Sequence, residues 1–279
     1  MPKLVDTHAH LDASIYERDL DIVVRRALQE GIWIVTVGTD YASSRRAVEI
    51  ARRYPEGVFA AVGLHPLRVG TRDMADDKLL DLEKFQELAS DPKVVALGDV
   101  GLDYHDLPAP VGRGDRPDLA ERIRTNQKKV LSRFLELSRE LRLPLLLHCR
   151  EAHQEMLEIL ETWDRTSRGF DSRGIVHHFS GTWKEARRYF NLDFLISFTG
   201  LVAHGGYRLD VIRKTPPNRL VVESECPHLT PNPWSIRRNE PSYLGHAVER
   251  LATARGVKPD ELAVQTTKNA LRTLRKLNR

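Results

Sequence analysis

The segment "DTHAHLD" near the N-terminus holds two histidines one residue apart, His8 and His10, directly after a short apolar run. If that run is a strand, both side chains point to the same face. Two adjacent imidazoles repel one another when charged, whereas a divalent metal ion accepts a lone pair from each. A lone H-x-H is more often a pair of exposed histidines, so further ligands must come from elsewhere in the chain.

Histidines and carboxylates also end other apolar runs. These residues are His65 in "GLHP", Asp99 and Asp103 in "LGDVGLDY", His148 in "HCR", His177 and His178 in "HHFSG", and Glu223 and Glu225 in "ESECP". Each of them alone is explained as a polar residue at a strand end. Their repetition at the same end of successive runs indicates one shared site.

The elements that must position these side chains are short apolar runs that alternate with longer amphipathic stretches. Strands are predicted at 3–10, 32–39, 57–66, 94–103, 144–150, 174–181, 193–200 and 219–227. Helices are predicted at 16–30, 43–54, 78–91, 117–142, 152–165, 182–190, 207–214, 242–256 and 258–277. Nearly continuous apolar strands are typical of parallel sheets that are covered on both faces.

Eight strand–helix units predict an α/β fold, the (β/α)8 TIM barrel, with an open doubly wound sheet as the alternative. No linker or low-complexity tract divides the chain, so a single domain is expected over residues 1–279. The carboxyl ends of barrel strands meet at one mouth, where active sites form. The histidines and carboxylates are therefore expected to converge there.

The composition, 41% hydrophobic and 29% charged residues, is that of a soluble globular protein. The net charge of +4 is compatible with a polyanionic substrate but too small for a surface dedicated to coating nucleic acid. Two cysteines, Cys149 and Cys226, suit a reducing compartment. Without an apolar run of about 20 residues or an export leader, the expected location is the cytoplasm, away from membranes.

Taken together, the motifs resemble a known family. The set "DTHAHLD", "GLHP", "LGDVGLDY", "HCR", "HHFSG", "ESECPHLTP", "RRNEP" and "TTKNALRTL" is similar in content and order to the TatD-type metal-dependent hydrolases, a branch of the amidohydrolase-like barrels mostly described as deoxyribonucleases. The resemblance covers the whole chain. It is highly specific for the family and much less specific for the substrate, because related barrels hydrolyse many compounds.

The resemblance implies a set of metal ligands. His8 and His10 would hold a first ion, and His148 and His177 a second. Glu225 would also ligate the first ion, whereas Glu223 would be a deeper structural carboxylate. His178 replaces the family's usual cysteine and, as the neighbour of His177, is expected to point off the other face of the strand.

Two carboxylate positions depart from the family pattern. Asp99 stands where the family usually has the glutamate that bridges both metals, and Glu225 stands where it usually has aspartate. One hypothesis is that the longer Glu225 compensates for the shorter Asp99, with two divalent cations (Zn, Mn, Mg or Fe) per chain. The alternative is that Asp99 cannot span two ions, so that only one binds firmly.

The resemblance and the strand faces also suggest roles in catalysis. A hydroxide held by one or two metal ions would be the nucleophile, and Glu225 would be the general base or orient the attacking water. Arg150, which shares a face with His148, would grip a phosphate oxygen. The substrate would further contact four residues around the mouth: His65, Asp103, Tyr104 and Arg238, although a salt bridge within its loop is an equal expectation for Arg238. Phe179 and Trp234 are candidates for base stacking, with packing the default for each.

Three functions remain open. The first is a deoxyribonuclease, working from the ends of a DNA strand as an exonuclease, with nucleic acid its only implied partner. The second is an ester or amide hydrolase, such as an aminoacyl-tRNA deacylase or a lactonase, since the same hydroxide attacks carbonyls. The third, a protein that binds without turnover, ranks last because every ligand position still holds a residue able to bind metal.

Overall fold

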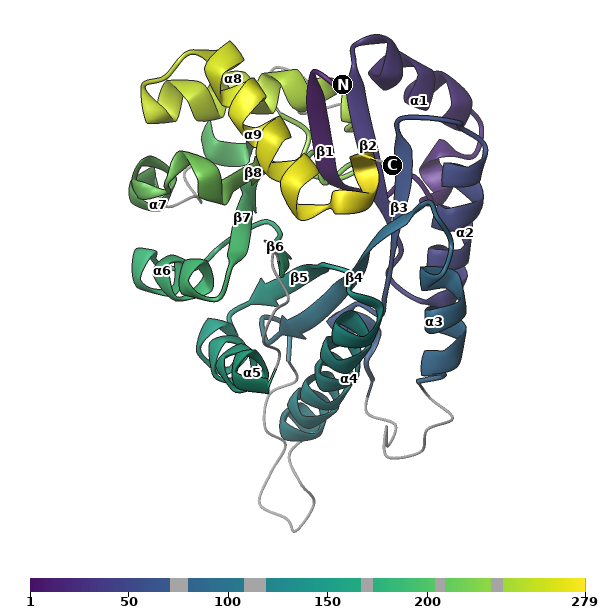
Figure 1. Ribbon diagram of the computed structural model, residues 1–279, viewed down its shortest axis with the longest axis vertical. Coiled ribbons are helices and arrows are strands. Elements are labelled where there is room, and N and C mark those ends of the chain that lie inside the picture. The colour runs from purple at the N-terminus through teal and green to yellow at the C-terminus, as the bar shows by residue number, and fades with distance from the viewer. Residues whose placement is uncertain (71–79, 108–118, 167–172, 204–208, 232–237, 279) are drawn as a thin grey trace.

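The computed structural model describes residues 1–70, 80–107, 119–166, 173–203, 209–231 and 238–278. Within these residues, eight parallel strands are neighbours in chain order, from β1 to β8 (Figure 1). The strands are β1 (Leu4–Ala9), β2 (Ile32–Val37), β3 (Val58–Val62), β4 (Val94–Asp103), β5 (Leu145–Arg150), β6 (Gly174–Val176), β7 (Phe194–Phe198) and β8 (Leu220–Val222). The fold is the predicted (β/α)8 TIM barrel.

Each predicted helix has a counterpart in the structure. The helices are α1 (Leu20–Gln29), α2 (Tyr41–Arg52), α3 (Leu82–Ala89), α4 (Leu119–Leu141), α5 (His153–Thr166), α6 (Trp183–Asn191), α7 (Leu209–Lys214), α8 (Leu244–Arg255) and α9 (Pro259–Thr273). Among the described residues, none of these helices has both the length and the apolar character that a membrane span requires.

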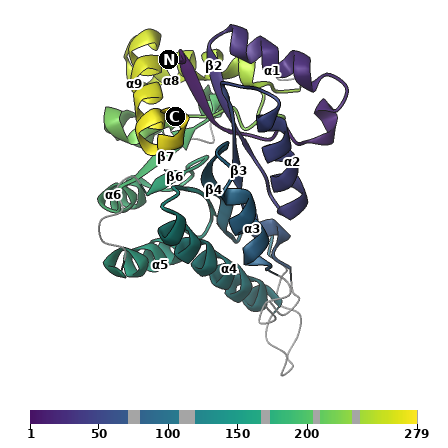
Figure 2. The ribbon, with the colours of Figure 1, turned by 45° about the vertical axis from the view of Figure 1, so that its right-hand side comes forward.

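The strands bury both faces, as their apolar sequences predict. Their outward side chains pack with the helices in one hydrophobic cluster that includes Leu97 and Val100. A second, smaller cluster fills the barrel interior with side chains such as Val5, Val35 and Leu146. The last part of the chain completes this interior cluster with Leu271, Leu274 and Leu277, which come from α9 and the turn after it. Figure 2 shows α9 beside the start of β1.

Strict alternation fails at three places on the described sheet, one of them in the β3–β4 ladder between Ala60 and Ala61, and the other two affect the predicted site. The β1–β2 ladder pairs Asp6 with Ile34 but Ala9 with Thr36, so β1 contains one extra residue between these pairs. The β4–β5 ladder has the same excess between Leu97 and Val100. Such a bulge reverses the face to which the following side chains point.

The first bulge allows Val5, His8 and His10 all to face the barrel axis, although Val5 and His8 are three residues apart. The second bulge turns Asp99 inward while Leu97 and Val100 both face the helices. The inward directions of the His8 and Asp99 side chains therefore depend on irregular backbone.

Three predicted strands are markedly shorter than expected. β3 ends at Val62, so His65 lies after it and not at its end. β6 ends at Val176 and β8 at Val222, so His177, His178, Glu223 and Glu225 lie in the segments that follow and not in the strands. His178 and Glu225 have positive φ angles of 43° and 57°. Alternation along a strand therefore does not decide where these four side chains point.

Irregular contacts join the last strand to the first. In the described residues no ladder pairs β8 with β1, but Glu225 N–H donates to His8 O (3.0 Å) and His10 N–H donates to Cys226 O (2.8 Å). The Asp6 carboxylate accepts hydrogen bonds from the backbone N–H groups of His8 (3.3 Å) and Ser224 (2.9 Å). The buried Asp6 carboxylate thus helps to join β1 to the segment after β8, whereas strand pairing joins the other neighbouring strands.

Gly101 is required where β4 runs against β5. A Cβ atom added there would lie 1.9 Å from the carbonyl oxygen of His148, and the residue has a φ of +154° that L side chains rarely adopt. Gly245, in α8, offers a matched control because an added Cβ meets no atom within 4 Å.

We predict that Gly101→Ala lowers the free energy of unfolding by ~2 kcal/mol or more, because backbone and not a flexible side chain blocks the added methyl group. Gly245→Ala should raise it by ~0.5 kcal/mol through the better helix propensity of alanine. Urea unfolding followed by circular dichroism measures both changes. A Gly101→Ala protein as stable as the parent would contradict the close approach of the two strands.

Candidate metal centre

Side chains from β1 and from the segment after β8 form the first part of the site. His8 Nε2 lies 3.3 Å from His10 Nε2 and 3.8 Å from Glu225 Oε2, and His10 Nε2 lies 3.9 Å from Glu225 Oε1. One potential ligand atom from each of the three residues falls within 4.8 Å of the other two. The H-x-H motif and the strand-eight carboxylate therefore meet as predicted in space.

The second part of the site is formed by residues from β4, β5 and the segments that follow β3 and β6. His148 Nδ1 lies 3.1 Å from His177 Nε2 and 3.2 Å from His65 Nε2. The Asp99 carboxylate lies between the two parts: Oδ1 is 3.3 Å from His177 Nε2, and Oδ2 is 3.6 Å from both His8 Nε2 and His65 Nε2. The structure thus brings the six predicted metal ligands, Asp99 among them, into one cluster.

Hydrogen bonds on the far side of two imidazoles fix their tautomers. His10 Nδ1 lies 2.8 Å from the carbonyl oxygen of Val37, so it carries the proton and leaves the lone pair of Nε2 facing the centre. His148 Nε2 lies 2.8 Å from Asp103 Oδ2 and donates to it, which leaves the lone pair of Nδ1 facing the centre. A partner on the outer nitrogen is the usual support of a metal-binding histidine.

The electrostatics of the centre favour a positive charge. Burial alone would raise the pKa of Asp99 and of Glu225, yet neighbouring histidines hold both pKa values well below the usual range. Burial would also lower the pKa of His177, but Asp99, Glu223 and Glu225 raise it well above its usual value. Burial lowers the pKa of His8 well below its ordinary value, so that imidazole is neutral and its lone pair is available.

Unpartnered buried atoms test whether the residues fit a metal. Within the part of the chain that the structure describes, four side chains of this centre have such an atom: His8 Nδ1, Asp99 Oδ1, His177 Nδ1 and Glu225 Oε2. Buried polar atoms without a partner cost free energy, and most proteins avoid them. A set of imidazole nitrogens and carboxylate oxygens gathered within a few ångströms of one another fits divalent cations such as Zn, Mn, Mg or Fe, without selecting one.

Glu223 is a structural carboxylate in this arrangement. It is fully buried, and it accepts hydrogen bonds from Ser197 Oγ (2.5 Å) and from the backbone N–H of His178 (2.7 Å). These bonds tie the segment after β6 to β7 and to the segment after β8. The partly buried His178 ring lies near enough to Glu225 and Glu223 for their charges to act on its pKa, which burial lowers. β6 ends before His178, so strand alternation does not decide where its ring points, and the expectation that it points away from the site stays a prediction.

Of the residues predicted to contact the substrate, Asp103 and Tyr104 are bound to other side chains of the protein, whereas Arg150 is exposed. Asp103 is 2% exposed and is occupied by His148, so it positions that histidine and does not lie on the open rim. Tyr104 donates to Glu155 Oε2 (3.2 Å), and the guanidinium of Arg124 stacks on its ring. Arg150 is exposed and makes no ion pair with the described residues, so its guanidinium is available to a ligand.

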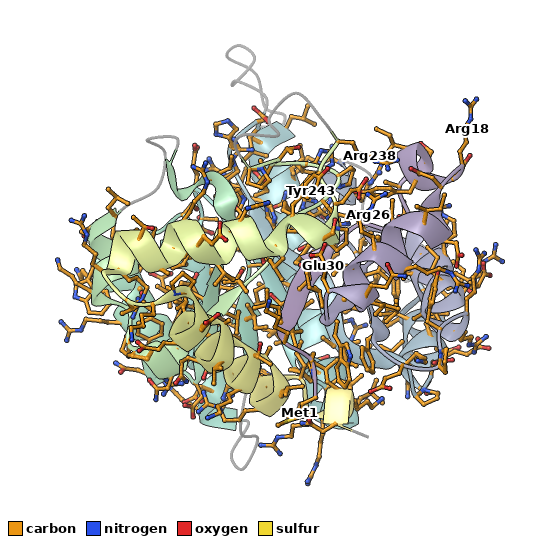
Figure 3. The ribbon with its side chains drawn as sticks, turned by 90° about the horizontal axis from the view of Figure 1, so that it is seen from above. Met1, Arg18, Arg26, Glu30, Arg238 and Tyr243 are labelled. Atoms are coloured by element: carbon orange, nitrogen blue, oxygen red, sulfur yellow. The ribbon has the colours of Figure 1, made fainter. Side chains whose placement is uncertain are left out.

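Arg238 forms a salt bridge between two loops, the second of the expectations for this residue. Its guanidinium donates to both carboxylate oxygens of Asp19 (2.9 and 2.7 Å) and to Glu240 Oε1 (3.1 Å), and it lies over the ring of Tyr16. Arg26 of α1 also pairs with Glu240. Arg26 and Arg238 lie close together in Figure 3. Arg238 thus links the loops that follow β1 and β8, and a substrate contact of this residue stays a prediction.

The remaining aromatic and sulfur candidates do not reach the site. Phe179 is 1% exposed and packs against Tyr189 and Phe198. Cys149 is buried, and burial raises the pKa of its thiol to about 12. Trp234 lies outside the described residues.

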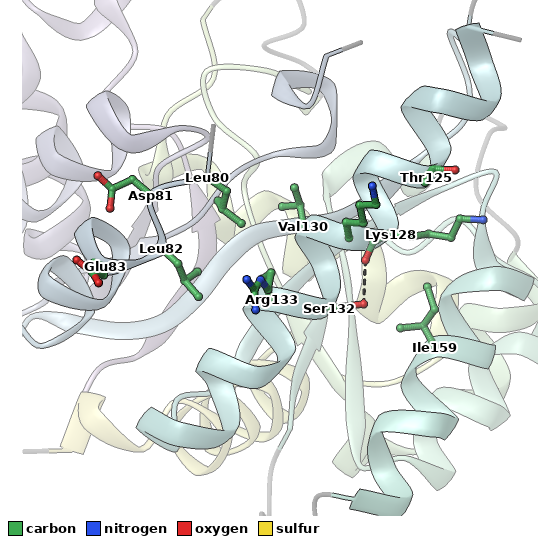
Figure 4. A pocket seen from close by; sticks show the side chains of 11 residues that line it. Leu80, Asp81, Leu82, Glu83, Thr125, Lys128, Val130, Ser132, Arg133 and Ile159 are labelled. Atoms are coloured by element: carbon green, nitrogen blue, oxygen red, sulfur yellow. Dashed lines mark hydrogen bonds between the residues drawn. The ribbon is translucent and has the colours of Figure 1, made fainter. Parts of the chain in front are cut away.

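A groove of about 800 Å³ lies on the outside of the barrel between α3, α4 and α5 (Figure 4). Leu82, Val130 and Ile159 form its apolar walls, and Lys129 and Arg133 supply positive charge. None of the residues that line it belongs to the metal centre. The groove is therefore distinct from the centre formed at the mouth of the barrel.

One contributor to the site was missed by the sequence analysis. Asp6 is fully buried between β1 and the segment after β8, and it fixes the backbone of both His8 and Ser224, the residue before Glu225. Burial raises its pKa to about 7. The aspartate of "VDTH" stands within an apolar run, where a charged residue is costly, and this was the available signal.

A barrel whose histidines and carboxylates converge at one mouth is typical of metal-dependent hydrolases. The family model described as TatD related DNase matches residues 5–275, and the chain belongs to this family. It is similar to the uncharacterized metal-dependent hydrolase YabD of Bacillus subtilis, with 36% identity over 98% of this chain and 99% of that relative.

Other relatives share the full length. The protein named 3'-5' ssDNA/RNA exonuclease TatD of Salmonella typhimurium is 32% identical over 96% of this chain and 97% of its own length. Among solved structures, the TatD homologue YJJV of Escherichia coli superposes with a TM-score of 0.80 at 27% identity, covering 97% of each chain. The family and the fold thus extend over the whole barrel.

We predict that Asp103→Asn lowers the affinity for a probe metal such as Zn²⁺ by about 10- to 100-fold. Asp103 accepts from two donors, His148 Nε2–H at Oδ2 and the backbone N–H of His105 at Oδ1. Asparagine has a single acceptor oxygen and no charge, so one of these bonds is lost and the other is weakened, and the support that aims His148 Nδ1 at the centre is reduced. Competition against a chelating dye measures the change. The matched control is Asp106→Asn, the same substitution at a side chain that is 76% exposed. Equal affinities for the two variants would contradict the positioning role.

Proposed function

We propose that the chain is a nuclease that hydrolyses phosphodiester bonds in single-stranded DNA from its ends. The observation that carries this proposal is the position of Asp99, whose two oxygens face histidines of both parts of the centre. Paired cation sites of this kind act on phosphate esters. The names of the TatD relatives support the choice of nucleic acid as substrate.

The residues divide into two ligand groups in this proposal. His8, His10 and Glu225 would hold one cation, His148 and His177 the other, and Asp99 would contact both. The compensation between Asp99 and Glu225 has support in the geometry, since Glu225 Oε2 reaches within 3.6 Å of His177 Nδ1 as well as 3.8 Å of His8 Nε2. The longer side chain thus spans part of the distance that the shorter Asp99 gives up.

When bound, the cations would lower the pKa of a water molecule and neutralise charge on the phosphoryl group. The protein groups have separate tasks. Glu225 is the proposed general base and water-orienting group, because Oε2 is buried without a partner at the centre. Arg150, exposed beside Asp103 on the β4–β5 ladder, binds a phosphate oxygen of the strand.

The cytoplasm is the proposed compartment for this activity. Cys149 and Cys226 are both buried free thiols, which suits reducing conditions. Nucleic acid is the proposed partner.

We predict two equivalents of divalent metal per chain by elemental analysis after reconstitution with Mn²⁺ or Zn²⁺. His8→Ala and His148→Ala should each retain about one equivalent, because each removes a ligand from one group only. Asp99→Glu should retain two. One equivalent in the parent and two in Asp99→Glu would instead mean that Asp99 is too short to contact both ions.

We further predict that the reconstituted protein shortens end-labelled single-stranded DNA, and that His8→Ala reduces this rate by at least about 10²-fold. The fold should persist, since His8 lies at the mouth of the barrel. Denaturing gels report the product ladder, and circular dichroism reports the fold. His246→Ala, an exposed histidine on α8, is the matched control and should keep the parental rate.

An acyl ester assayed beside the DNA tests the alternative of ester or amide hydrolysis. Ester turnover with intact DNA would overturn the nuclease proposal. Full nuclease activity in His8→Ala would show that the cleavage comes from a contaminant or from another site.

A further inference from the structure

His65 belongs to the histidine cluster by distance, but its hydrogen bonding differs from that of its neighbours. Its Nε2 lies 3.2 Å from His148 Nδ1 and 3.6 Å from Asp99 Oδ2, and the three residues form a group compact enough to hold a metal ion. Distance alone therefore makes His65 a ligand candidate.

The outer nitrogen of His65 excludes that role. The backbone N–H of Leu67 points at His65 Nδ1, 3.1 Å away. A backbone N–H can only donate, so Nδ1 must accept and has no proton. A neutral imidazole whose Nδ1 accepts carries its proton on Nε2. The nitrogen that faces the centre is therefore an N–H group without a free lone pair.

The local sequence maintains this tautomer. "GLHP" places His65 directly before a short 3-10 turn (Pro66–Arg68), and the His65 side chain caps the turn by accepting from Leu67. Pro66 sits at the first position of the turn, where its fixed φ is favourable and its missing N–H costs nothing. His10 and His148 differ, because their outer nitrogens face acceptors, Val37 O and Asp103 Oδ2.

We propose that His65 is not a metal ligand and that its Nε2–H donates a hydrogen bond to a phosphoryl oxygen of the substrate. This inference rests on the proposed nuclease function for the identity of the oxygen. The N–H faces the side of the centre where Asp99 and His148 meet, and the side chain is 13% exposed at the mouth. A fixed donor at this position stabilises charge that develops on the phosphoryl group during attack.

Two substitutions separate the donor from the turn cap. His65→Gln places an amide N–H near the position of Nε2 but gives up the acceptor at Nδ1. His65→Asn places an amide oxygen near Nδ1, which keeps the cap, but has no donor near Nε2. A donor role predicts that Asn loses about 10²-fold in kcat, with Gln at least tenfold better than Asn. A role in capping alone predicts the reverse order and would overturn the proposal.

Two readouts are independent of activity. Nitrogen-15 NMR of histidine-labelled, Zn²⁺-loaded protein should show the His65 proton on Nε2. Elemental analysis should find the parental metal content in both His65 variants, whereas His148→Ala loses metal. A protonated Nδ1, or metal loss in both His65 variants, would make His65 a ligand and overturn the proposal.

These readouts also distinguish the two proposals from each other. If the parent leaves nucleic acid intact and hydrolyses an ester, the nuclease proposal fails. The tautomer, the metal content and the order of the Gln and Asn variants on that ester still decide whether His65 is a donor or a ligand.

Discussion

The centre depends on irregular backbone at the points where β1 and β4 approach the mouth of the barrel. Regular strands alternate, so Val5 and His8 could not both face the axis, and Asp99 would face the helices together with Leu97. One extra residue between Asp6 and Ala9 in β1, and one between Leu97 and Val100 in β4, reverse the alternation. In each of these strands, the residues near the start therefore fill the barrel interior with apolar side chains, and the residues near the end point polar groups inward.

The junction between β8 and β1 imposes a second constraint. The barrel closes there through the Asp6 carboxylate, the hydroxyl of Thr7 donating to Val222 O, and two backbone bonds. Ladder pairing would hold Glu225 in an extended strand, whereas the irregular junction allows its positive φ of 57°. The same junction joins the backbone of His8 to that of Glu225, so the first group of potential ligands is assembled by the closure of the barrel itself.

The sequence predicted the barrel and the convergence of His8, Asp99, His148 and Glu225, because periodicity and motif order are local or collinear signals. It did not predict the bulges or the short β6 and β8, since a strand of "GIV" and one of "GIVHHFSG" have the same apolar start. The expected direction of His178 relied on strand alternation, which does not apply beyond the short β6. The contacts of Arg238 with Asp19 and of Asp103 with His148 were not predicted, because these partners lie far away in the chain and depend on tertiary packing.

The roles of the histidines are decided by atoms outside the centre. His10, His65 and His148 each place a ring nitrogen 3.1–3.3 Å from a ring nitrogen of a neighbouring histidine. The groups behind the three rings, a carbonyl, a backbone N–H and a carboxylate, nevertheless set opposite proton positions. Exchanging the acceptor behind one ring for a donor converts a lone pair into an N–H without moving the ring. A cluster defined by distance alone therefore overstates the number of ligands, and the hydrogen bond on the far nitrogen is the feature that separates a residue that binds a cation from one that binds the substrate's oxygen.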